Sequence, residues 1–363
     1  MNIKESFKRP FLKNGLSGIM RAKNEAHFIE KCIDSCIDAL DELIVVYNDC
    51  TDSTPEILAR KQKQYPDKLK IYSYNHSVLS HNLTWEEFEY AINLPEDSVR
   101  LHSNQCNYAL SKVSYKYAVK IDPDQIYFAD EINKWRDVCN GKIQMKWRVG
   151  FVLGWFFMMY ISFYRRVSVK LRHPCLQVIP DWLINVLKGH YREYIKWKFQ
   201  KGQVAISCSG VNLFYDDTWY IPFDGYNIHP PYNGEGDHLI FRLSDKTFFI
   251  RHYNDKKPYT VIELFQHPYE VVVADTLFWF HLHANRAHCY DKVKKVRQEN
   301  PDLFVLPEDF IRMSYKEVHD KMVPNAHTLY QRILFALVHK MGLRSVKAHI
   351  VLLENIKMIF EKK

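Results

Sequence analysis

The hydrophobic and polar positions of the first part of the chain alternate between the patterns of buried strands and amphipathic helices. Short apolar runs at 16–20, 43–47 and 117–121 predict strands, because runs of this length are typical of strands buried in parallel sheets, and residues 69–74 alternate as a further strand does. Apolar residues recur at helical spacing over 28–40. The alternation predicts an α/β fold, with a Rossmann-like, mostly parallel sheet flanked by helices.

Two more helices are indicated in this part of the chain. One begins at Thr54, which we expect to cap it, with Pro55 in its first position. The other covers 104–117 and leads directly into the strand 117–121. In open parallel sheets, ligands bind beyond the carboxyl ends of the strands, so the loops that follow the strands are where functional side chains are expected.

Residues 142–201 differ in character from the rest of the chain. The run 150–164 is almost wholly apolar and aromatic, but it is shorter than the roughly 20 residues that a membrane-spanning helix needs. The whole segment holds twelve lysines and arginines against two acids, in a chain of net charge +8. Basic residues mixed with aromatic ones favour a helical hairpin lying on an anionic bilayer surface. A helical insertion that simply packs on the domain is the alternative.

We divide the chain into a first half-domain at 1–141, the basic aromatic insertion at 142–201, a region of short strands at 202–290 and a helical region at 291–363. The N-terminus has no apolar stretch of signal-peptide length, and none of the eight cysteines forms a C-x-x-C pair. We therefore expect a cytoplasmic setting without a disulfide framework.

The clearest chemical signal is Asp122-Pro123-Asp124, which directly follows a predicted strand. Mg²⁺ and Mn²⁺ favour carboxylate oxygens, and they are commonly held by one or two carboxylates together with substrate phosphates. A cation held in this way offsets the charge that develops when a diphosphate leaves. We therefore predict a Mn²⁺ or Mg²⁺ site at Asp122 and Asp124.

Two polar loops follow the first two predicted strands. They are Arg21–Glu25, which reads RAKNE, and Asn48–Thr54, which reads NDCTDST. Their carboxylates and amides suit contacts to a base and a ribose, and helix capping is the alternative explanation of each. Further along, His281 and His283 stand two apart on one side of a predicted strand, where either could complete a metal site; burial as ordinary core residues is the alternative.

Three of these segments together resemble a known family. IMRAKNE at 19–25, IVVYNDCTDST at 44–54 and VKIDPDQ at 119–125 resemble the nucleotide-sugar-binding half of family-2-type inverting glycosyltransferases with the GT-A fold, of the bacterial surface-polysaccharide type. The resemblance covers about 16–130. It implies that the nucleotide sugar contacts Arg21, Asn24, Glu25, Asn48, Asp49, Asp122 and Asp124. Where the family often has Asp-Asp, this chain has Asn48-Asp49, so the contact to the base stays open.

The resemblance also implies a general base that deprotonates the acceptor hydroxyl. Asp237 matches the family position best and Glu235 is the alternative, while Asn212 falls in a segment that lines the sugar pocket. The implied donor is a uridine diphosphate hexose or N-acetylhexosamine. The implied acceptor is a bacterial lipopolysaccharide or capsule glycan, and the implied place is the cytoplasmic face of the inner membrane, to which the protein binds peripherally.

Two other functions fit the sequence less well. A nucleic-acid-binding protein could use the basic segment 142–201, but the nearly uncharged run 150–164 would make a poor phosphate groove, so we expect no nucleic-acid partner. A nucleotidyltransferase would typically need an early glycine-rich triphosphate loop, and the sequence contains neither G-x-G-x-x-G nor a P-loop.

Overall fold

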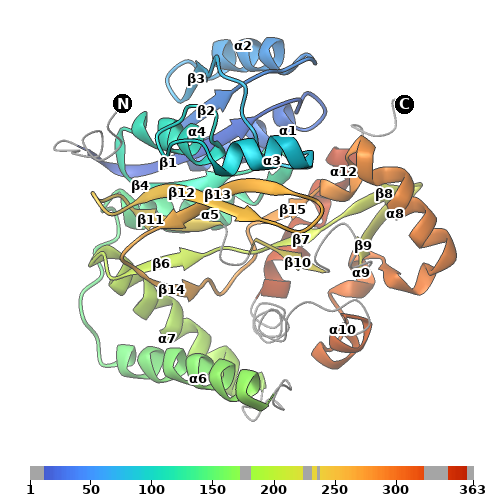
Figure 1. Cartoon of the computed structure of the whole chain (residues 1–363). Coiled ribbons are helices and arrows are strands. Elements are labelled where there is room, and N and C mark those ends of the chain that lie inside the picture. The colour runs from blue at the N-terminus through green and yellow to red at the C-terminus, as the bar shows by residue number, and fades with distance from the viewer. Residues whose placement is uncertain (1–11, 172–180, 224–230, 235–237, 323–341, 358–363) are drawn as a thin grey trace. The chain divides into compact units, whose positions relative to one another are not determined.

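The computed structural model describes residues 12–171, 181–223, 231–234, 238–322 and 342–357 (Figure 1). The chain divides into two compact units, each assembled from segments that are distant in sequence. Unit 1 comprises Met1–Pro123, Cys139–Lys142 and Ile240–Glu270. Unit 2 comprises Asp124–Val138, Ile143–Leu239 and Val271–Lys363.

Unit 1 is built on five neighbouring strands in the order β11-β4-β1-β2-β3. Their bounds are Lys13–Ala22 for β1, Glu42–Tyr47 for β2, Leu69–Ser73 for β3, Tyr115–Ile121 for β4 and Leu239–Arg242 for β11. Strand β1 pairs in parallel with β2 and β4, β2 pairs in parallel with β3, and β11 is antiparallel to β4. The mostly parallel sheet predicted from the sequence is therefore confirmed.

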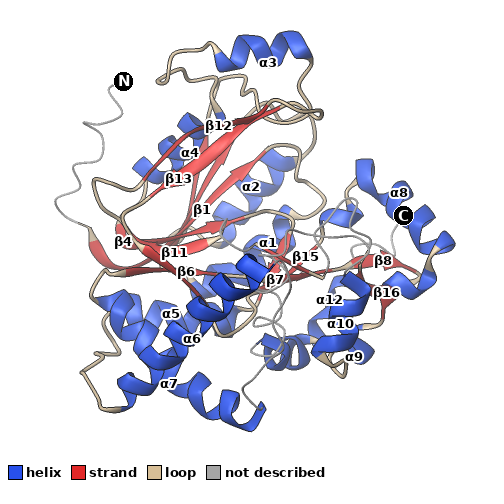
Figure 2. Ribbon diagram, turned by 60° about the horizontal axis from the view of Figure 1, so that its bottom comes forward, coloured by secondary structure: helices blue, strands red, loops and turns tan. Residues whose placement is uncertain are grey.

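Helices and a β-hairpin cover this sheet. The helices are α1 (Ile29–Cys36), η1 (Ile37–Ala39), α2 (Thr54–Gln64), α3 (Trp85–Ile92) and α4 (His102–Ser111), and the hairpin consists of β12 (Phe248–Asn254) and β13 (Thr260–Gln266). Helix α2 packs along β3, while α4 contacts both the sheet and the hairpin (Figure 2). Because β2 is covered on both faces, its residues Leu43–Val46 are fully buried, which explains their continuous apolar run.

The strand order creates a topological switch point in unit 1. The chain runs outward from β1 to β2 and β3, and then returns to the other side of β1 as β4. Met20 of β1 is in register with Ile121 of β4, so the loops that follow these two strands leave the sheet at the same edge. In open α/β sheets, this is where ligands bind.

Two details of the predicted helices are wrong. Thr54 is the first residue of α2 and not its cap: its amide donates to Asp52 Oδ1 at 3.0 Å, and its hydroxyl accepts from the Glu25 amide at 2.8 Å. Helix α4 ends at Ser111, and β4 already begins at Tyr115. The connection turns there because the Ser114 amide donates to the buried Glu42 carboxylate at 2.6 Å.

Unit 2 contains small sheets. One has the order β10-β7-β15-β5, a second has the order β16-β9-β8, and β6 neighbours β14. The bounds are β5 Gln125–Tyr127, β6 Val204–Ser207, β7 Gly210–Asn212, β8 Phe214–Asp216, β9 Thr218–Pro222, β10 Tyr232–Asn233, β14 Glu270–Val273, β15 Trp279–His281 and β16 Phe304–Val305. Trp279 of β15 is almost completely buried and lies at the centre of the four-stranded sheet.

Helices make up much of the rest of unit 2. They are α5 (Ala129–Cys139), α6 (Gly150–Leu171), α7 (Asp181–Gln200), η2 (His283–Asn285), α8 (Ala287–Glu299), η3 (Pro301–Leu303), α9 (Pro307–Phe310), α10 (Tyr315–Met322) and α12 (Val351–Lys357). Helices α6 and α7 pack against each other as a pair. Within the described ranges, we find no helix whose length and apolar character would let it cross a bilayer.

The close approach of β7 to β15 depends on a glycine. A Cβ atom on Gly210 would fall within the indole ring of Trp279. Since Trp279 is held among buried residues, the ring has no room to move aside. Gly189 of α7 provides a contrast, because a Cβ atom there would meet nothing within 4 Å.

We expect Gly210→Ala to lower the free energy of unfolding by about 1–3 kcal/mol, because it overpacks a filled core. The matched control Gly189→Ala should raise that free energy by about 0.5–1 kcal/mol, since alanine is the better helix former. Urea unfolding followed by circular dichroism measures both changes. A Gly210→Ala protein as stable as the wild type would contradict the observed packing of Trp279.

Candidate functional site

In unit 2, the side chain of Asp124 is the centre of a compact polar cluster. It is only 6% exposed, and its Oδ2 accepts a hydrogen bond from Arg286 Nε at 2.9 Å. His281 Nε2 and His283 Nδ1 each lie 3.6 Å from the same oxygen. The sheet fixes this arrangement, because β5 and β15 pair with Gln125 opposite His281, and the Leu282 amide donates to the Asp124 carbonyl at 2.8 Å.

The two histidines come together through a turn. We expected both on one side of a strand, but β15 ends at His281, and His283 begins the short helix η2, so that expectation is wrong for His283. The turn is held by Asn285, whose Nδ2 donates to the carbonyls of Leu213 and Leu282. As a result the two imidazole rings lie nearly parallel, with their centroids 5.6 Å apart.

Asn212 positions His281. It is fully buried on β7, in register with His281 of β15, and its Oδ1 lies 2.8 Å from His281 Nδ1. Because the amide oxygen can only accept, Nδ1 donates to it, and Nε2 is the ring nitrogen that faces Asp124. A hydrogen bond of this kind to the second ring nitrogen is typical of histidines that bind a metal ion.

The charges in this cluster depend on one another. Burial alone would raise the pKa of Asp124, but His281, His283 and Arg286 outweigh it and hold the pKa well below its usual value. Burial would lower the pKa of His283, but hydrogen bonds to Asp124 and Cys289 raise it to about 9. Without a bound cation, Asp124 is therefore an anion and His283 is protonated at neutral pH.

The donor set of this cluster fits a divalent cation. One carboxylate oxygen of Asp124 and one nitrogen from each of His281 and His283 lie within 4.8 Å of one another. Oxygen and imidazole donors together suit Mn²⁺ and similar borderline metals, whereas Mg²⁺ prefers oxygen alone. These three residues could hold a metal ion after His283 has lost its proton.

In unit 1, the switch point holds a second buried cluster, centred on Glu263 of β13. The Glu263 carboxylate accepts from Arg21 Nη2 at 3.0 Å and lies 2.8 Å from His102 Nδ1. Lys120 Nζ lies 3.6 Å from Glu263 and 4.0 Å from the carboxylate of Asp122. The sequence-predicted residues Arg21 and Asp122 therefore belong to one charged network.

The protonation states of this network follow from burial and charge. Burial would raise the pKa of Glu263, but Arg21, His102 and Lys120 hold it well below its usual value. Burial and the neighbouring Arg21 lower the pKa of His102 to about 4, although Glu263 opposes them. His102 is therefore neutral at pH 7, and Arg21 and Lys120 carry the positive charge.

The sequence analysis did not identify Glu263. Its strand alternates, and Glu263 falls on the same side as Val261 and Phe265, while the apolar Leu264 on the other side is exposed. An acid on the apolar side of an alternating strand was the available signal. It gave no indication of Arg21, His102 and Lys120 as partners, because they are distant in sequence.

The loop after β1 is joined to the loop after β2. Asn24 has a positive φ of 56°, and its Oδ1 accepts from the Thr51 amide at 2.7 Å. Glu25 is buried, and its amide donates to the Thr54 hydroxyl. The predicted site residues Asn24 and Glu25 therefore link the loop after β1 to the loop after β2.

Asn48 and Asp49 occupy the second of these loops. Asn48 is buried, and its Oδ1 accepts from Gln105 Nε2 of α4 at 2.8 Å. Asp49 has a φ of 42°, and its carboxylate lies 3.8 Å from Lys23 Nζ. Of the two side chains, that of Asp49 is the more accessible to a ligand.

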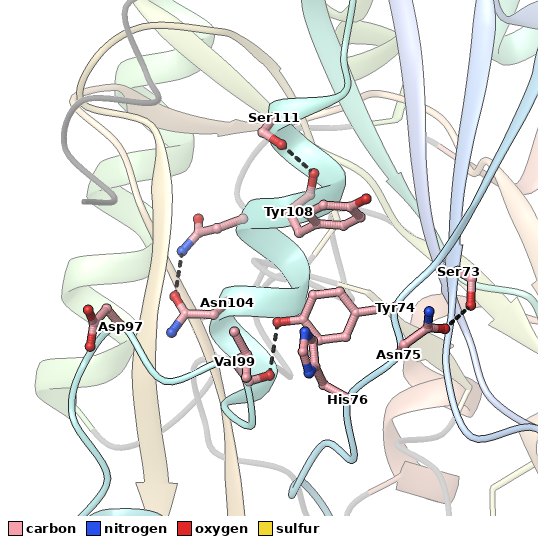
Figure 3. A pocket seen from close by; sticks show the side chains of 10 residues that line it. Ser73, Tyr74, Asn75, His76, Asp97, Val99, Asn104, Tyr108 and Ser111 are labelled. Carbon is pink, nitrogen blue, oxygen red and sulfur yellow. Dashed lines mark hydrogen bonds between the residues drawn. The ribbon is translucent and has the colours of Figure 1, made fainter. Parts of the chain in front are cut away.

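A cavity of about 340 Å³ lies at the end of β3, and the sequence gave no indication of it (Figure 3). Tyr74 and His76 line it from the loop after β3, and Asn104 and Tyr108 line it from α4. The Tyr74 hydroxyl donates to the Val99 carbonyl at 2.8 Å, which fixes one wall.

The two predicted general bases, Asp237 and Glu235, lie outside the described residues. The neighbouring residues Gly234 and His238 belong to unit 2. Gly234 has a positive φ of 91°, and His238 is buried with its ring centroid 4.8 Å from that of Trp279.

Comparison with known proteins gives a family match in the first part of the chain. Residues 17–79 match the model of Glycosyl transferase family 2. The resemblance to family-2 glycosyltransferases is confirmed over this range. No curated protein matches the chain.

Several solved structures are similar over a limited part of the chain. One is glucosyl-3-phosphoglycerate synthase from Mycobacterium tuberculosis in complex with Mn²⁺, uridine diphosphate and glucosyl-3-phosphoglycerate, at 22% identity and a TM-score of 0.21. The similarity covers 34% of this chain and 37% of the synthase, so it spans little more than a third of that protein. Another is a mycobacterial protein, at 19% identity over 34% of each chain, with a TM-score of 0.21.

We expect Glu263→Gln to lower the free energy of unfolding by about 3–5 kcal/mol at pH 7, because it removes the buried carboxylate that offsets the charges of the partly buried Arg21 and Lys120. The control Glu96→Gln should cost no more than about 1 kcal/mol, because Glu96 pairs with Arg251 while its own side chain is 70% exposed. Denaturant unfolding measures both.

The pH dependence of the same variant gives a second readout. The folded-state pKa of Glu263 is depressed, so its stabilisation is present above the unfolded value of 4.5 and is lost as the pH falls below it. The stability difference between wild type and Glu263→Gln should therefore stay constant from pH 7 to about 4.5 and shrink at lower pH. A difference that stays constant down to pH 3 would rule out the charged network.

Proposed function

We propose that this protein is an inverting, divalent-metal-dependent glycosyltransferase that moves a sugar from a nucleotide diphosphate donor to an acceptor hydroxyl. The observation that carries the proposal is the buried cluster of Asp124, His281 and His283, in a chain whose residues 17–79 match Glycosyl transferase family 2. The carboxylate and the two imidazoles converge, as they would around a cation that binds a diphosphate.

In this proposal, Mn²⁺ or Mg²⁺ is held by Asp124, His281 and His283, with Asp122 contributing a further carboxylate. When bound, the cation neutralises charge on the departing diphosphate. His281, His283 and Arg286 together keep Asp124 ionised, and the Arg286 guanidinium donates to its Oδ2. Asn212 acts through His281, whose Nε2 it directs toward the carboxylate.

The nucleotide-sugar donor is assigned to the loops of unit 1 and to the acidic pair that follows β4. The residues proposed to contact it are Arg21, Asn24, Glu25, Asn48, Asp49, Asp122 and Asp124, with Asn212 at the sugar. We propose a uridine diphosphate hexose or N-acetylhexosamine as donor. Arg21 and Lys120 support this role, because they bring positive charge to the edge of the sheet where a diphosphate would bind.

Asp237 is proposed as the general base, with Glu235 as the alternative. The base removes the proton of the acceptor hydroxyl as that oxygen attacks the anomeric carbon and the nucleoside diphosphate leaves from the opposite face. A single displacement of this kind inverts the configuration at the anomeric carbon. No covalent intermediate on the protein is required.

We further propose that the acceptor is a bacterial surface glycan, a lipopolysaccharide or a capsule chain, and that the protein acts peripherally at the cytoplasmic face of the inner membrane. The basic and aromatic composition of residues 142–201 supports this, because it suits contact with an anionic lipid surface that carries a lipid-linked acceptor.

Asp124→Asn tests the metal site. In the wild type, uridine diphosphate with Mn²⁺ should raise the melting temperature, because a ligand that binds only the folded state stabilises it. In Asp124→Asn, the Mn²⁺-dependent part of that rise should disappear and turnover should fall by at least about a hundredfold. The exposed control Asp245→Asn should behave like the wild type. Retention of the Mn²⁺-dependent rise in Asp124→Asn would disprove this site.

Asp237→Asn should separate donor binding from transfer. Because a general base acts only on the acceptor proton, the donor-dependent rise in melting temperature should be unchanged while kcat falls by about 10²–10⁴-fold. Glu235→Gln is the matched comparison and should keep most of the activity. The opposite result, a loss in Glu235→Gln with an active Asp237→Asn, would assign the base to Glu235.

A further inference from the structure

One side of helix α6 presents apolar side chains to the exterior. Val152, Phe156, Met159 and Phe163 follow the i, i+4, i+7, i+11 spacing of a single helical face, and all four are exposed. Phe156 is 57% exposed and Phe163 is 66% exposed. With their exposed neighbours Leu153 and Trp155, these residues define what we call the α6 face. It contains no charged side chain.

The opposite side of α6 packs against the rest of the protein. Phe151, Phe157 and Ile161 are buried there, and Phe157 stacks edge-on against Tyr191 of α7 with ring centroids 5.5 Å apart. Gly154 allows the helices to approach closely, since a Cβ atom there would lie 2.5 Å from the His190 carbonyl oxygen. Helix α6 is thus apolar on both sides, and only one of them is covered by α7.

Helix α7 holds this pair firmly on unit 2 (Figure 1). The Tyr191 hydroxyl donates to the Val273 carbonyl at 2.7 Å, and Arg192 Nε donates to the nearly buried Asp275 carboxylate at 2.6 Å. Because α7 is fixed in this way, the α6 face is a constant feature of the surface. Turning it inward would break the contacts that α6 makes with α7.

Positive charge and tryptophan accompany the α6 face. Lys146, Trp147 and Arg148 are exposed immediately before the helix, and Trp182 is exposed near the start of α7. Residues 142–201 together carry twelve basic against two acidic side chains. Tryptophan and basic residues beside an apolar helical face are typical of helices that lie in the interface of a bilayer.

We propose that the α6 face inserts into the headgroup–acyl boundary of an anionic lipid bilayer, with α6 lying in the membrane plane. This inference deepens the peripheral-membrane part of the proposed function by identifying the surface that meets the lipid, and it is independent of the residues assigned to chemistry. A second copy of the chain is a poorer occupant, because pairing two α6 faces would bring two strongly basic segments together. Anionic lipid offsets that charge.

Vesicle flotation of the full chain tests the proposal. The wild type should float with phosphatidylglycerol-containing vesicles, and much less with phosphatidylcholine alone or when salt is raised from about 0.1 M to 1 M. The double variant Phe156→Ser/Phe163→Ser should lower the partition coefficient onto anionic vesicles by at least about tenfold, because each phenyl ring leaves the apolar boundary. Both positions are exposed, so its melting temperature should stay close to that of the wild type.

The control Tyr253→Ser/Leu264→Ser removes exposed apolar area from the hairpin β12–β13 and should float like the wild type. A wild type that stays at the bottom with anionic vesicles would overturn the proposal, and so would a double variant that floats unchanged. A wild type that is dimeric in sedimentation, does not float, and becomes monomeric in the double variant would instead make the α6 face a self-association surface. Donor-dependent stabilisation measured without vesicles reports on the chemistry separately.

Discussion

Two buried carboxylates need cations around them, and much of the structure is arranged to provide these. An isolated carboxylate in a protein interior costs several kcal/mol, so each buried acid must be paired. Asp124 is paired by Arg286 and two histidines, which all come from the end of β15 or the few residues after it. Glu263 is paired by Arg21, His102 and Lys120, which lie on three separate elements. Each acid thereby ties distant segments of its unit together.

In the proposed function, this pairing also prepares the site for its ligands. A carboxylate that is already ionised and surrounded by fixed donors does not have to reorganise when a cation or a phosphate arrives. The link from Asn212 to His281 adds to this, since it fixes the orientation of the imidazole before any ligand binds. The same charges that stabilise the fold are therefore the ones that the proposed reaction would use.

Strands β1 and β2 could be predicted from the sequence because most of their residues are buried, which gives apolar runs, whereas the partly buried β3 was indicated by its alternation. The position of the acidic pair after β4 could also be predicted, since the end of an apolar run marks the end of a strand. The first residue of α2 could not be predicted correctly, because the side chains of Asp52 and Thr54 can both accept from a backbone amide. Tertiary contacts decide which of the two does so at the start of the helix.

The polar clusters themselves could not be predicted in full. Glu263 stands alone in its strand, and its partners come from segments more than a hundred residues away, which no local pattern reveals. His283 reaches Asp124 only because the strand stops at His281 and a turn redirects the chain. Spacing along a strand picked out two histidines that do lie beside Asp124, but it predicted the wrong local geometry for them.

Trp279 connects two parts of unit 2 to which the proposed function gives different chemical tasks. Its indole Nε1 donates to Asn233 Oδ1 at 2.9 Å, and a Cβ atom on Gly234 would collide with its ring. Two residues further along the same strand is His281. A substitution at 279 would therefore disturb the start of the segment carrying Asp237 and the imidazole beside Asp124 at once. A side chain at 234 would need a residue smaller than tryptophan at 279, and the φ of 91° at Gly234 would strain it even then.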